Sequence, residues 1–275
     1  MKKINNNVPI IFEILLFLIA IIFISPLLLT LLNSFKTDIE IKINILSLPK
    51  RLNFINYIEA WHRIKFPSIF FRTLFITTLS TLGIILISSM ASYAMVREKS
   101  KISWGFFMFF TFSMIVPFHT IMISLVKNAA ALKLTNSLGI IPIYWGLGTP
   151  LAIFLYHGFI KSIPLELEES AAIDGAGYFR IFFTIVFPLL TPVTTTIIIL
   201  DVLWIWNDFL LPLIILPSTQ YTIQLAQNVF FKQFGLSEYG KAMASLVLSA
   251  SPVIIFFLAM QKYIIKGIMA GAIKG

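Results

Sequence analysis

The sequence has no cysteine and few charged residues. Cysteine is absent from all 275 residues, which excludes disulfides, thiolate metal sites and cysteine nucleophiles. Charged side chains make up only 12% of the chain, whereas a soluble globular domain carries about 25%. Because so little charge cannot cover a compact surface in water, the composition excludes an ordinary soluble enzyme, a disordered tail and a nucleic-acid-binding domain. The chain is instead 58% hydrophobic, which predicts an all-α, polytopic membrane protein.

Six apolar runs are long enough to cross a bilayer as helices, which takes about 20 residues each. The first run is too long for a signal peptide and has no cleavage site. Prolines in or near the runs predict kinks, because neighbouring helices satisfy the freed carbonyls. These prolines are Pro117, Pro188, Pro192 and Pro252. The runs lie at about 10–32, 69–96, 103–126, 138–160, 184–206 and 242–265.

The six runs predict one transmembrane domain over residues 1–275, with both termini on the same side. Basic residues flank the runs on both sides, so the net charge of +9 carries no weight as a sign of a nucleic-acid partner. Close to the run ends, the cluster Arg97, Lys99 and Lys101 with the basic termini outweighs Lys127 and Lys133, which places the termini in the cytoplasm. Long extracytoplasmic loops are then expected at about 33–68 and 207–241, and a cytoplasmic loop at about 161–183.

Patterns of catalytic and metal-binding residues are missing. No His-Glu-x-x-His or Gly-x-Ser-x-Gly segment occurs, and His62, His119 and His157 lie far apart in the sequence. The segment 235–241 has the spacing of a phosphate-binding loop, but Ala242 replaces the Ser or Thr that would hold magnesium, so we interpret the match as chance. We expect no catalytic residue, no metal and no cofactor bound by this chain.

The cytoplasmic loop predicts a short helix with defined ends. Ser162 can cap its start and Pro164 suits its first turn, while Gly175 is well placed to end it. Three glutamates complement the positive end of the helix dipole; they are Glu166, Glu168 and Glu169. An amphipathic connector lying on the membrane is the alternative, but an acidic face is unfavourable at an anionic leaflet. We therefore predict an element that docks into another protein, with Ala171 and Ala172 giving it a slim face.

This segment resembles the signature of the membrane-spanning subunits of binding-protein-dependent ABC importers. That signature reads Glu-Ala-Ala, three residues, Gly, nine residues, Ile-x-Leu-Pro, and the sequence has Glu169-Ser-Ala, Gly175 and Ile185-Val-Phe-Pro at the same spacing. Ser170 and Phe187 are departures that leave the spacing intact. Further segments narrow the resemblance to the smaller membrane subunit of the maltose-type carbohydrate permeases. They are 34–37, 91–94 with Arg97, Pro117, 134–137, 206–209 and 261–275.

The resemblance implies a function and a set of partners. It implies a permease subunit that takes a sugar or oligosaccharide from an extracytoplasmic solute-binding protein and moves it inward by alternating access, in the cell membrane of a bacterium or archaeon. The implied partners are a second, homologous permease subunit and two ATPase subunits, which hold ATP and magnesium. Coupling to the ATPase is implied for Glu168, Glu169, Ala171, Asp174, Gly175 and Ala176.

The resemblance also implies contacts with the solute. In related transporters the loop between the last two spans approaches the sugar cleft of the binding protein, which here points to about residues 216–239. Gln224, Gln227 and Asn228 could hydrogen-bond sugar hydroxyls there, and solvation of the loop is an equal alternative. The candidate pathway residues are Asp201, Trp206, Asn207 and Asp208.

Asp201 lies well inside the fifth run, so its carboxyl group should face the bundle interior or a water-filled path. A structural role and a pathway role are both open for it. The alternative function is a secondary, ion-coupled sugar transporter, which would normally show repeats that the sequence lacks. An intramembrane enzyme would need converging catalytic groups, which Asp201 alone cannot supply.

Overall fold

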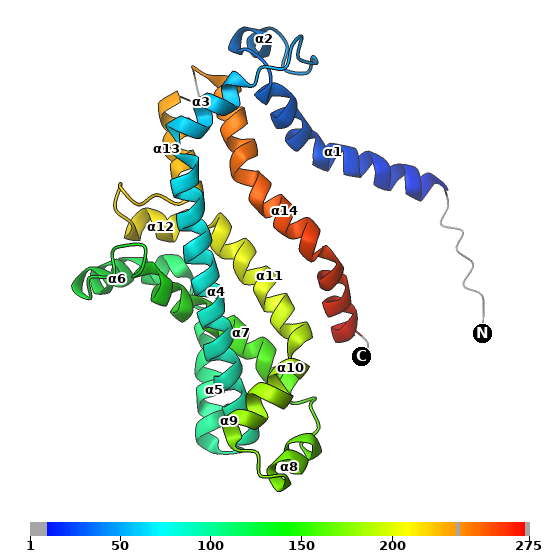
Figure 1. Ribbon diagram of the computed structural model, residues 1–275, viewed down its shortest axis with the longest axis vertical. Coiled ribbons are helices and arrows are strands. Elements are labelled where there is room, and N and C mark those ends of the chain that lie inside the picture. The colour runs from blue at the N-terminus through cyan, green and yellow to red at the C-terminus, as the bar shows by residue number, and fades with distance from the viewer. Residues whose placement is uncertain (1–9, 235–236, 273–275) are drawn as a thin grey trace. The chain divides into compact units, whose positions relative to one another are not determined.

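The structure, a computed structural model, describes residues 10–234 and 237–272, and every regular element within them is helical. The predicted all-α class is therefore confirmed for this part of the chain. The order of the helices can be followed in Figure 1. They are α1 (Ile10–Ser34), α2 (Asp38–Ile43), α3 (Ile55–Arg63), α4 (Phe66–Arg97), α5 (Lys101–Ser113), α6 (Phe118–Ala131), α7 (Ile140–Ile160), α8 (Glu166–Ile173), α9 (Tyr178–Ile181), the π-helical turn η1 (Phe182–Val186), α10 (Phe187–Leu189), α11 (Thr191–Asn207), α12 (Leu210–Ile215), α13 (Ile223–Phe234) and α14 (Tyr239–Ala272).

Four single helices in the described residues are long and apolar enough to cross a membrane. They contain the segments Phe12–Ser34, Phe66–Arg97, Ile140–Ile160 and Tyr239–Gln261. Two more spans arise if each bent pair of helices counts as one. The pairs are Lys101–Ser113 with Phe118–Ala131, and Tyr178–Leu189 with Thr191–Asn207. The six predicted runs correspond to these four helices and two bent pairs.

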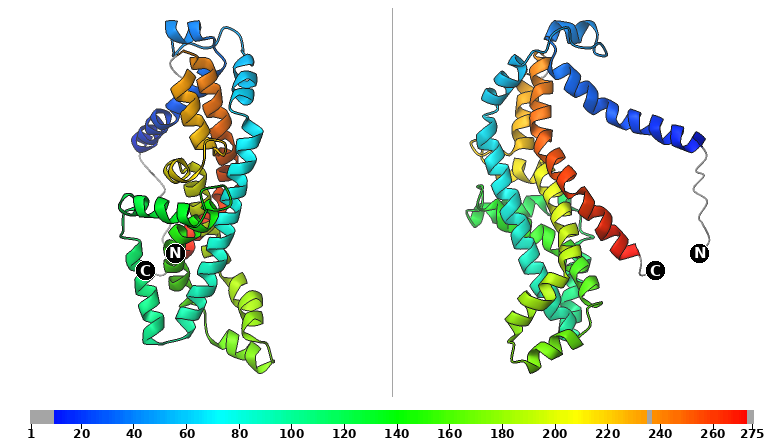
Figure 2. Two further views of the ribbon diagram at one scale, coloured as in Figure 1. Left: turned by 90° about the vertical axis from the view of Figure 1, so that its left-hand side faces the viewer. Right: turned by 45° about the vertical axis from the view of Figure 1, so that its right-hand side comes forward.

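Both bent pairs change direction beside proline, as the sequence predicts. α5 and α6 meet at an angle of 104°, at a break that contains Pro117 (Figure 2). The second pair bends by 75° at Leu190, between Pro188 and Pro192. Proline causes such breaks because it lacks the amide hydrogen and its ring collides with the preceding turn. Pro252 differs, since α14 continues through it as one helix.

The segments predicted as long extracytoplasmic loops also contain helices. α2 and α3 lie within 33–68, and α12 and α13 lie within 207–241. α2 begins with a capping box, in which the Thr37 hydroxyl accepts from the Glu40 backbone N–H while the Glu40 carboxylate accepts from the Thr37 N–H. Reciprocal capping of this kind fixes the start of even a short helix. The Thr-Asp-Ile-Glu sequence carries this signal.

The chain forms two compact units, which are described separately. The first unit comprises Met1–Phe66 and Gln227–Ser251, and the second comprises Pro67–Ala226 and Pro252–Gly275. The single permease domain expected over residues 1–275 stays a prediction.

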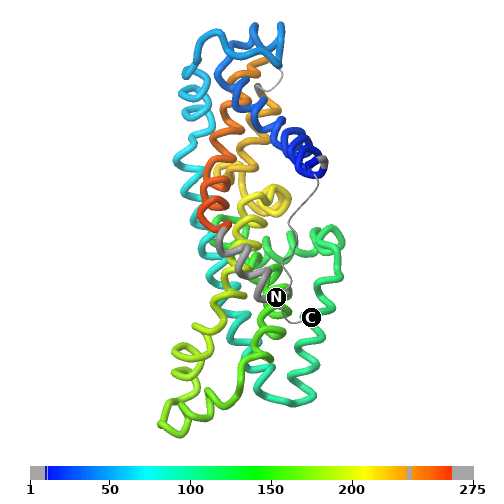
Figure 3. The backbone as a smooth tube through the Cα atoms, turned by 90° about the vertical axis from the view of Figure 1, so that its right-hand side faces the viewer, coloured from blue at the N-terminus to red at the C-terminus, as the bar shows by residue number. Residues whose placement is uncertain are grey.

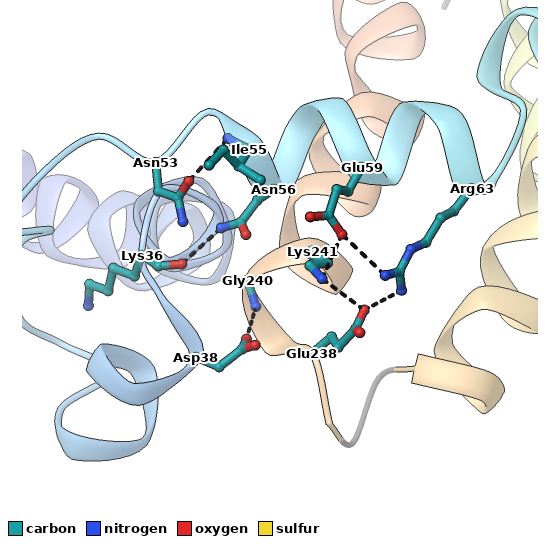
Figure 4. A network of polar contacts seen from close by, with 10 residues as sticks. All are labelled: Lys36, Asp38, Asn53, Ile55, Asn56, Glu59, Arg63, Glu238, Gly240 and Lys241. Carbon is teal, nitrogen blue, oxygen red and sulfur yellow. Dashed lines mark hydrogen bonds and ion pairs between the residues drawn. The ribbon is translucent and has the colours of Figure 1, made fainter.

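In the first unit, hydrogen bonds tie α2 and the chain before it to α3 and the start of α14 (Figure 4). Asn56 Nδ2 donates to the backbone oxygens of Ser34 and Lys36, each at 2.8 Å. The Gly240 N–H donates to Asp38 Oδ1 at 2.9 Å. A Cβ on Gly240 would lie 2.6 Å from the Lys36 oxygen, so this close approach requires glycine.

An ion-pair network joins α3 to the start of α14 in the same unit (Figure 4). Lys241 Nζ lies 2.7 Å from a Glu59 carboxylate oxygen and 3.4 Å from one of Glu238. Arg63 pairs with both glutamates. Lys241 is the last residue of the segment that has the spacing of a phosphate-binding loop, and its ammonium group is therefore paired with glutamates of its own unit. Gly235 of that segment lies outside the described residues.

In the second unit, glycines allow α4 and α7 to pack closely. A Cβ on Gly83 would lie 2.0 Å from Trp145 Nε1, and one on Gly148 would lie 2.5 Å from Ile84 Cδ1. Trp145 Nε1 donates to the Leu79 backbone oxygen at 3.1 Å. Small residues at such contacts let membrane helices approach one another. The buried core around them includes Ile76, Tyr144, Tyr156, Val186 and Leu190.

Candidate functional site

The acid-rich helix α8 begins later than the sequence predicts. Its N-cap residue is Leu165, without a side-chain cap, so Pro164 precedes the helix instead of lying in its first turn. The predicted Ser162 cap is wrong, because the Ser162 hydroxyl donates to the Phe159 backbone oxygen at 2.7 Å and closes the end of α7. The negative charge that stabilises the positive end of α8 comes from the three glutamates of its first turn.

The end of α8 is fixed by Gly175, as predicted. Gly175 has φ of +80°, in the left-handed region that glycine adopts without steric cost. Its N–H donates to the Ala172 oxygen, and the Ala176 N–H donates to the Ala171 oxygen, both at 3.0 Å. These two bonds form a Schellman motif, which satisfies the last carbonyls of the helix. The chain then turns toward α9 (Figure 3).

The Glu168 side chain packs against its own chain and does not belong to an exposed docking surface. Its side chain is buried, and its two carboxylate oxygens accept hydrogen bonds from Tyr93 Oη at 2.7 Å and Arg97 Nε at 2.8 Å. Arg97 also donates to the Ile163 backbone oxygen at 3.2 Å. Tyr93 and Arg97 belong to the last two turns of α4. The Tyr93–Arg97–Glu168 cluster therefore fastens α8 to the end of a candidate membrane span.

The remaining residues predicted for coupling divide into two groups. Glu169, Asp174 and Gly175 are exposed, whereas Ala171 and Ala176 are partly buried against the unit core. The sequence interpretation missed Ile173, which is 87% exposed. Ile173 lies four residues after Glu169, a spacing that puts two side chains on the same helix face. An isoleucine at this spacing in an otherwise acidic helix is the signal that could have identified it.

α8 is also joined to the bent span that follows it. Gly177 links it to α9, and the Tyr93 ring lies 5.1 Å from both the Tyr178 and Phe182 rings, measured between centroids. Phe182 opens the π-helical turn, which ends at the fully buried Val186. The second half of the signature, residues 185–188, thus begins in the π-helical turn and continues into α10, just before the bend of the span. α8 is consequently held by two candidate spans, α4 on one side and the α9–α11 pair on the other.

Asp201 and Trp206 are both buried in α11 of the second unit; burial was expected for Asp201, whereas Trp206 was predicted only as a pathway residue. Asp201 is 4% exposed, and its Oδ2 accepts no hydrogen bond from the described residues. Trp206 Nε1 likewise has no acceptor among them, while its ring packs edge-to-face with Phe70 at 5.9 Å. The two alternatives for Asp201, structural and pathway-lining, both remain predictions.

Asn207 and Asp208 follow at the end of α11 and have different surroundings. Asn207 is exposed, and its Oδ1 accepts from Gln224 Nε2 at 3.3 Å. Asp208 accepts from the Tyr144 hydroxyl at 3.0 Å and from the Leu210 N–H at 3.0 Å, so it caps the start of α12. The structure thus brings together one predicted pathway residue, Asn207, and one predicted sugar-facing amide, Gln224.

The predicted sugar-facing residues lie on a helix, α13, and not in an irregular loop. Gln227 is buried, and both ends of its amide are used by α14: Nε2 donates to Ser245 Oγ at 2.8 Å, and Oε1 accepts from Ser249 Oγ at 3.0 Å. This amide is therefore neither solvated nor directed at a solute here. Asn228 is half-buried, and Gln224 makes the contact to Asn207 described above.

A cleft of about 640 Å³ lies between the α5–α6 bend, α7 and the end of α11. Its lining is mainly apolar. Asp208 offers a carboxylate that can accept hydrogen bonds, and Trp204 offers an aromatic face. Neither Asp201 nor Trp206 belongs to it. Among the described residues no group of three His, Asp or Glu side chains is arranged to hold a metal ion. The lining residues are Ser113, Met114, Val116, Phe118, Ile121, Gly146, Leu147, Pro150, Leu151, Trp204, Asp208, Leu210 and Leu211.

Comparisons with known proteins cover nearly the whole chain. Residues 83–269 match the family model described as the binding-protein-dependent transport system inner membrane component. The chain is 40% identical over 257 residues to the probable starch degradation products transport system permease protein AmyC of Thermoanaerobacterium thermosulfurigenes, covering 93% of each chain. It is 39% identical over 230 residues to the melibiose/raffinose/stachyose import permease protein MelC of Bacillus subtilis, covering 82% of this chain and 83% of MelC.

A solved structure has the same fold. It is the crystal structure of a bacterial ABC transporter involved in the import of the acidic polysaccharide alginate. The TM-score is 0.79 with 22% sequence identity, and the match covers 92% of this chain and 95% of the other.

Proposed function

The chain belongs to the family of binding-protein-dependent transport system inner membrane components, and we propose that it is one membrane-spanning subunit of an ATP-driven importer of a sugar or oligosaccharide. The observation that carries this proposal is the near full-length similarity to permeases named for starch degradation products, for melibiose, raffinose and stachyose, and for multiple sugars. A secondary, ion-coupled transporter has no support in these comparisons. Within this family, we propose that the chain is the smaller of the two membrane subunits.

We propose six membrane spans, with the two bent pairs each crossing once. The composition and length of the helices support this number, since four single helices and two bent pairs are apolar enough to span. Both termini and α8 then lie in the cytoplasm. This orientation is supported by Arg97, Lys99 and Lys101 at the α4–α5 turn, because basic residues near span ends favour the cytoplasmic side.

The proposed partners are a second permease subunit, two ATPase subunits and an extracytoplasmic solute-binding protein. ATP and magnesium are held by the ATPase subunits, and this chain contributes no catalytic group. α8 would dock into the ATPase with the face that carries Glu169 and Ile173, next to Asp174 and Gly175. The Tyr93–Arg97–Glu168 cluster would hold α8 rigidly enough to transmit ATPase closure to α4 and to the α9–α11 pair.

On the solute side, the cleft that contains Trp204 and Asp208 is the proposed place of sugar contact within the second unit. An aromatic ring offers a sugar its apolar face, and a carboxylate accepts hydrogen bonds from hydroxyls. The Asn207–Gln224 pair lies at the same end of α11 and is proposed to meet the sugar released by the binding protein.

Co-purification followed by transport tests the proposal. The tagged chain, expressed from its own genomic neighbourhood, should purify with an ATPase and a second permease, and the binding protein should be thermally stabilised by one of a panel of oligosaccharides. Proteoliposomes of this complex should then take up that sugar only when ATP and binding protein are present. Isolation of the chain without an ATPase, together with uptake driven by an ion gradient alone, would establish the secondary transporter instead.

A further inference from the structure

Residues 35–53 of the first unit form a closed loop, which we call the outer loop. Its ends are joined by the Asn53 N–H donating to the Phe35 oxygen at 2.9 Å. Lys36 is fully buried, and its Nζ donates to the oxygens of Asn44 at 3.2 Å and Ile45 at 3.1 Å. The outer loop therefore has a defined internal structure, and α2 is part of it.

The outer loop presents large apolar side chains outward. Ile39 and Ile43, four residues apart on one face of α2, are 71% and 78% exposed. Leu46 and Leu48, in the turn that follows, are 70% and 73% exposed. Apolar groups gathered at this density on a structured loop mark a surface that is covered by something other than water.

Apart from the buried Lys36, the acidic and basic side chains of the outer loop differ in exposure. Both acidic groups are satisfied by backbone N–H groups of the unit: Asp38 accepts from Gly240, and Glu40 accepts from Thr37. Asp38 and Glu40 are half-buried, whereas three basic residues of the loop are exposed: Lys42, which lies over the Tyr239 ring, Lys50 and Arg51. A surface that combines outward aliphatic side chains with outward cations is complementary to a bilayer with anionic headgroups.

The position of the outer loop in the chain agrees with this chemistry. α1 is a candidate membrane span that ends at Ser34, and the outer loop begins at the next residue. Lysine and arginine stems can extend their charges to the headgroups while neighbouring aliphatic groups enter the acyl region. We propose that the outer loop is an interfacial anchor, inserting Ile39, Ile43, Leu46 and Leu48 into the membrane surface and binding anionic phospholipid headgroups through Lys50 and Arg51.

The absence of cysteine makes a depth measurement straightforward. Single-cysteine variants Leu46→Cys and Leu48→Cys of the full chain, purified with the subunits that accompany it, carry a nitroxide spin label in nanodiscs without binding protein. Collision with oxygen, which concentrates in lipid, is compared with collision with a water-soluble nickel chelate. Ile41→Cys is the matched control, because Ile41 is buried within the same loop and should exclude both agents.

The proposal predicts that labels at 46 and 48 collide with oxygen several-fold more often than with the chelate. It also predicts deeper insertion in phosphatidylglycerol discs than in phosphatidylcholine discs, a difference that Lys50→Gln with Arg51→Gln removes. Dominant collision with the chelate would show a water-exposed loop and overturn the proposal. Exclusion of both agents, as at position 41, would show a protein partner on this surface and would overturn it equally. Neither readout depends on transport, so the result is independent of the function proposed above.

Discussion

Arg97 at the end of α4 holds the buried carboxylate of Glu168 in α8, with Nε 2.8 Å from Oε1. Because Tyr93 takes the other carboxylate oxygen, the position of α8 is tied to α4 by charge and by hydrogen-bond direction. Glu168, which the sequence suggests as part of a docking face, is thus a positioning residue. The proposed docking face is therefore the exposed one, which carries Glu169 and Ile173.

Removing one partner of this pair should destabilise the fold. Arg97→Met leaves the Glu168 carboxylate buried without its cation, a change that costs about 3 kcal/mol in comparable buried pairs. Thermal unfolding of the detergent-solubilised complex measures the loss. The double variant Arg97→Met with Glu168→Leu should recover most of it, because replacing both charges by apolar groups leaves no unpaired charge. Equal melting temperatures for wild type and Arg97→Met would contradict this role.

Gly175 and Gly177 offer a matched pair of substitutions. A Cβ would meet nothing within 4 Å at either position, but only Gly175 has positive φ. Gly175→Ala should therefore cost about 1 kcal/mol through backbone strain alone and loosen the end of α8, lowering transport per ATP hydrolysed. Gly177→Ala should leave that ratio unchanged. The same ratio in both variants would show that the turn after α8 has no part in coupling.

The exposed face of α8 should act on coupling without affecting stability. Glu169→Ala and Ile173→Ser remove exposed side chains, so unfolding should change by less than about 0.5 kcal/mol. Sugar uptake should nevertheless fall at least several-fold while complex assembly and basal ATP hydrolysis persist. Glu166→Gln, in the first turn of α8, is the comparison variant and should retain uptake. Wild-type uptake by both face variants would reject α8 as the coupling element.

The contact between α4 and α7 should be intolerant of one methyl group. Gly83→Ala would place its Cβ 2.0 Å from Trp145 Nε1, so the indole must move and give up its hydrogen bond to Leu79. Overpacking of this kind typically costs 1–3 kcal/mol. Gly146→Ala, where nothing lies within 4 Å, should leave the melting temperature unchanged. A stable Gly83→Ala variant would mean that these two helices are not packed as described.

The α3–α14 ion-pair network should make stability depend on acid pH. The hydrogen bond from Lys241 and its charge lower the pKa of Glu59 below its ordinary value of 4.5. A lowered pKa in the folded state means that the contribution is present above about 4.5 and is lost as pH falls through the lower value. The melting temperature of wild type should therefore drop more between pH 6 and pH 3.5 than that of Lys241→Met. Parallel pH curves for the two proteins would contradict the network.

The sequence predicted the helical class and the location of the apolar segments well, because the length of an apolar run and the placement of prolines act locally. The bends at Pro117 and at Leu190 follow from the same local rule. The end of α8 was equally predictable, since glycine after an alanine-rich turn is a strong stop signal.

Side-chain direction was not predictable from the sequence. Glu168 and Glu169 are adjacent and chemically identical, yet one is buried against Arg97 and the other is exposed, and only the packing of α8 on α4 decides between them. Gln227 was similarly a candidate for sugar contact until α14 supplied Ser245 and Ser249 as its partners. The segment 261–275, which supports the family resemblance, has its side chains beyond Gln261 outside the described residues.

The proposed function is inward transport of a sugar, driven by ATP that a partner subunit hydrolyses. Uptake of the radiolabelled sugar that stabilises the binding protein, measured in proteoliposomes with ATP enclosed on the ATPase side, tests it most directly. Accumulation of the sugar is expected to require ATP and binding protein on the opposite side, and to be lost in Ile173→Ser without loss of assembly. Accumulation that persists without ATP and follows an imposed ion gradient would contradict it.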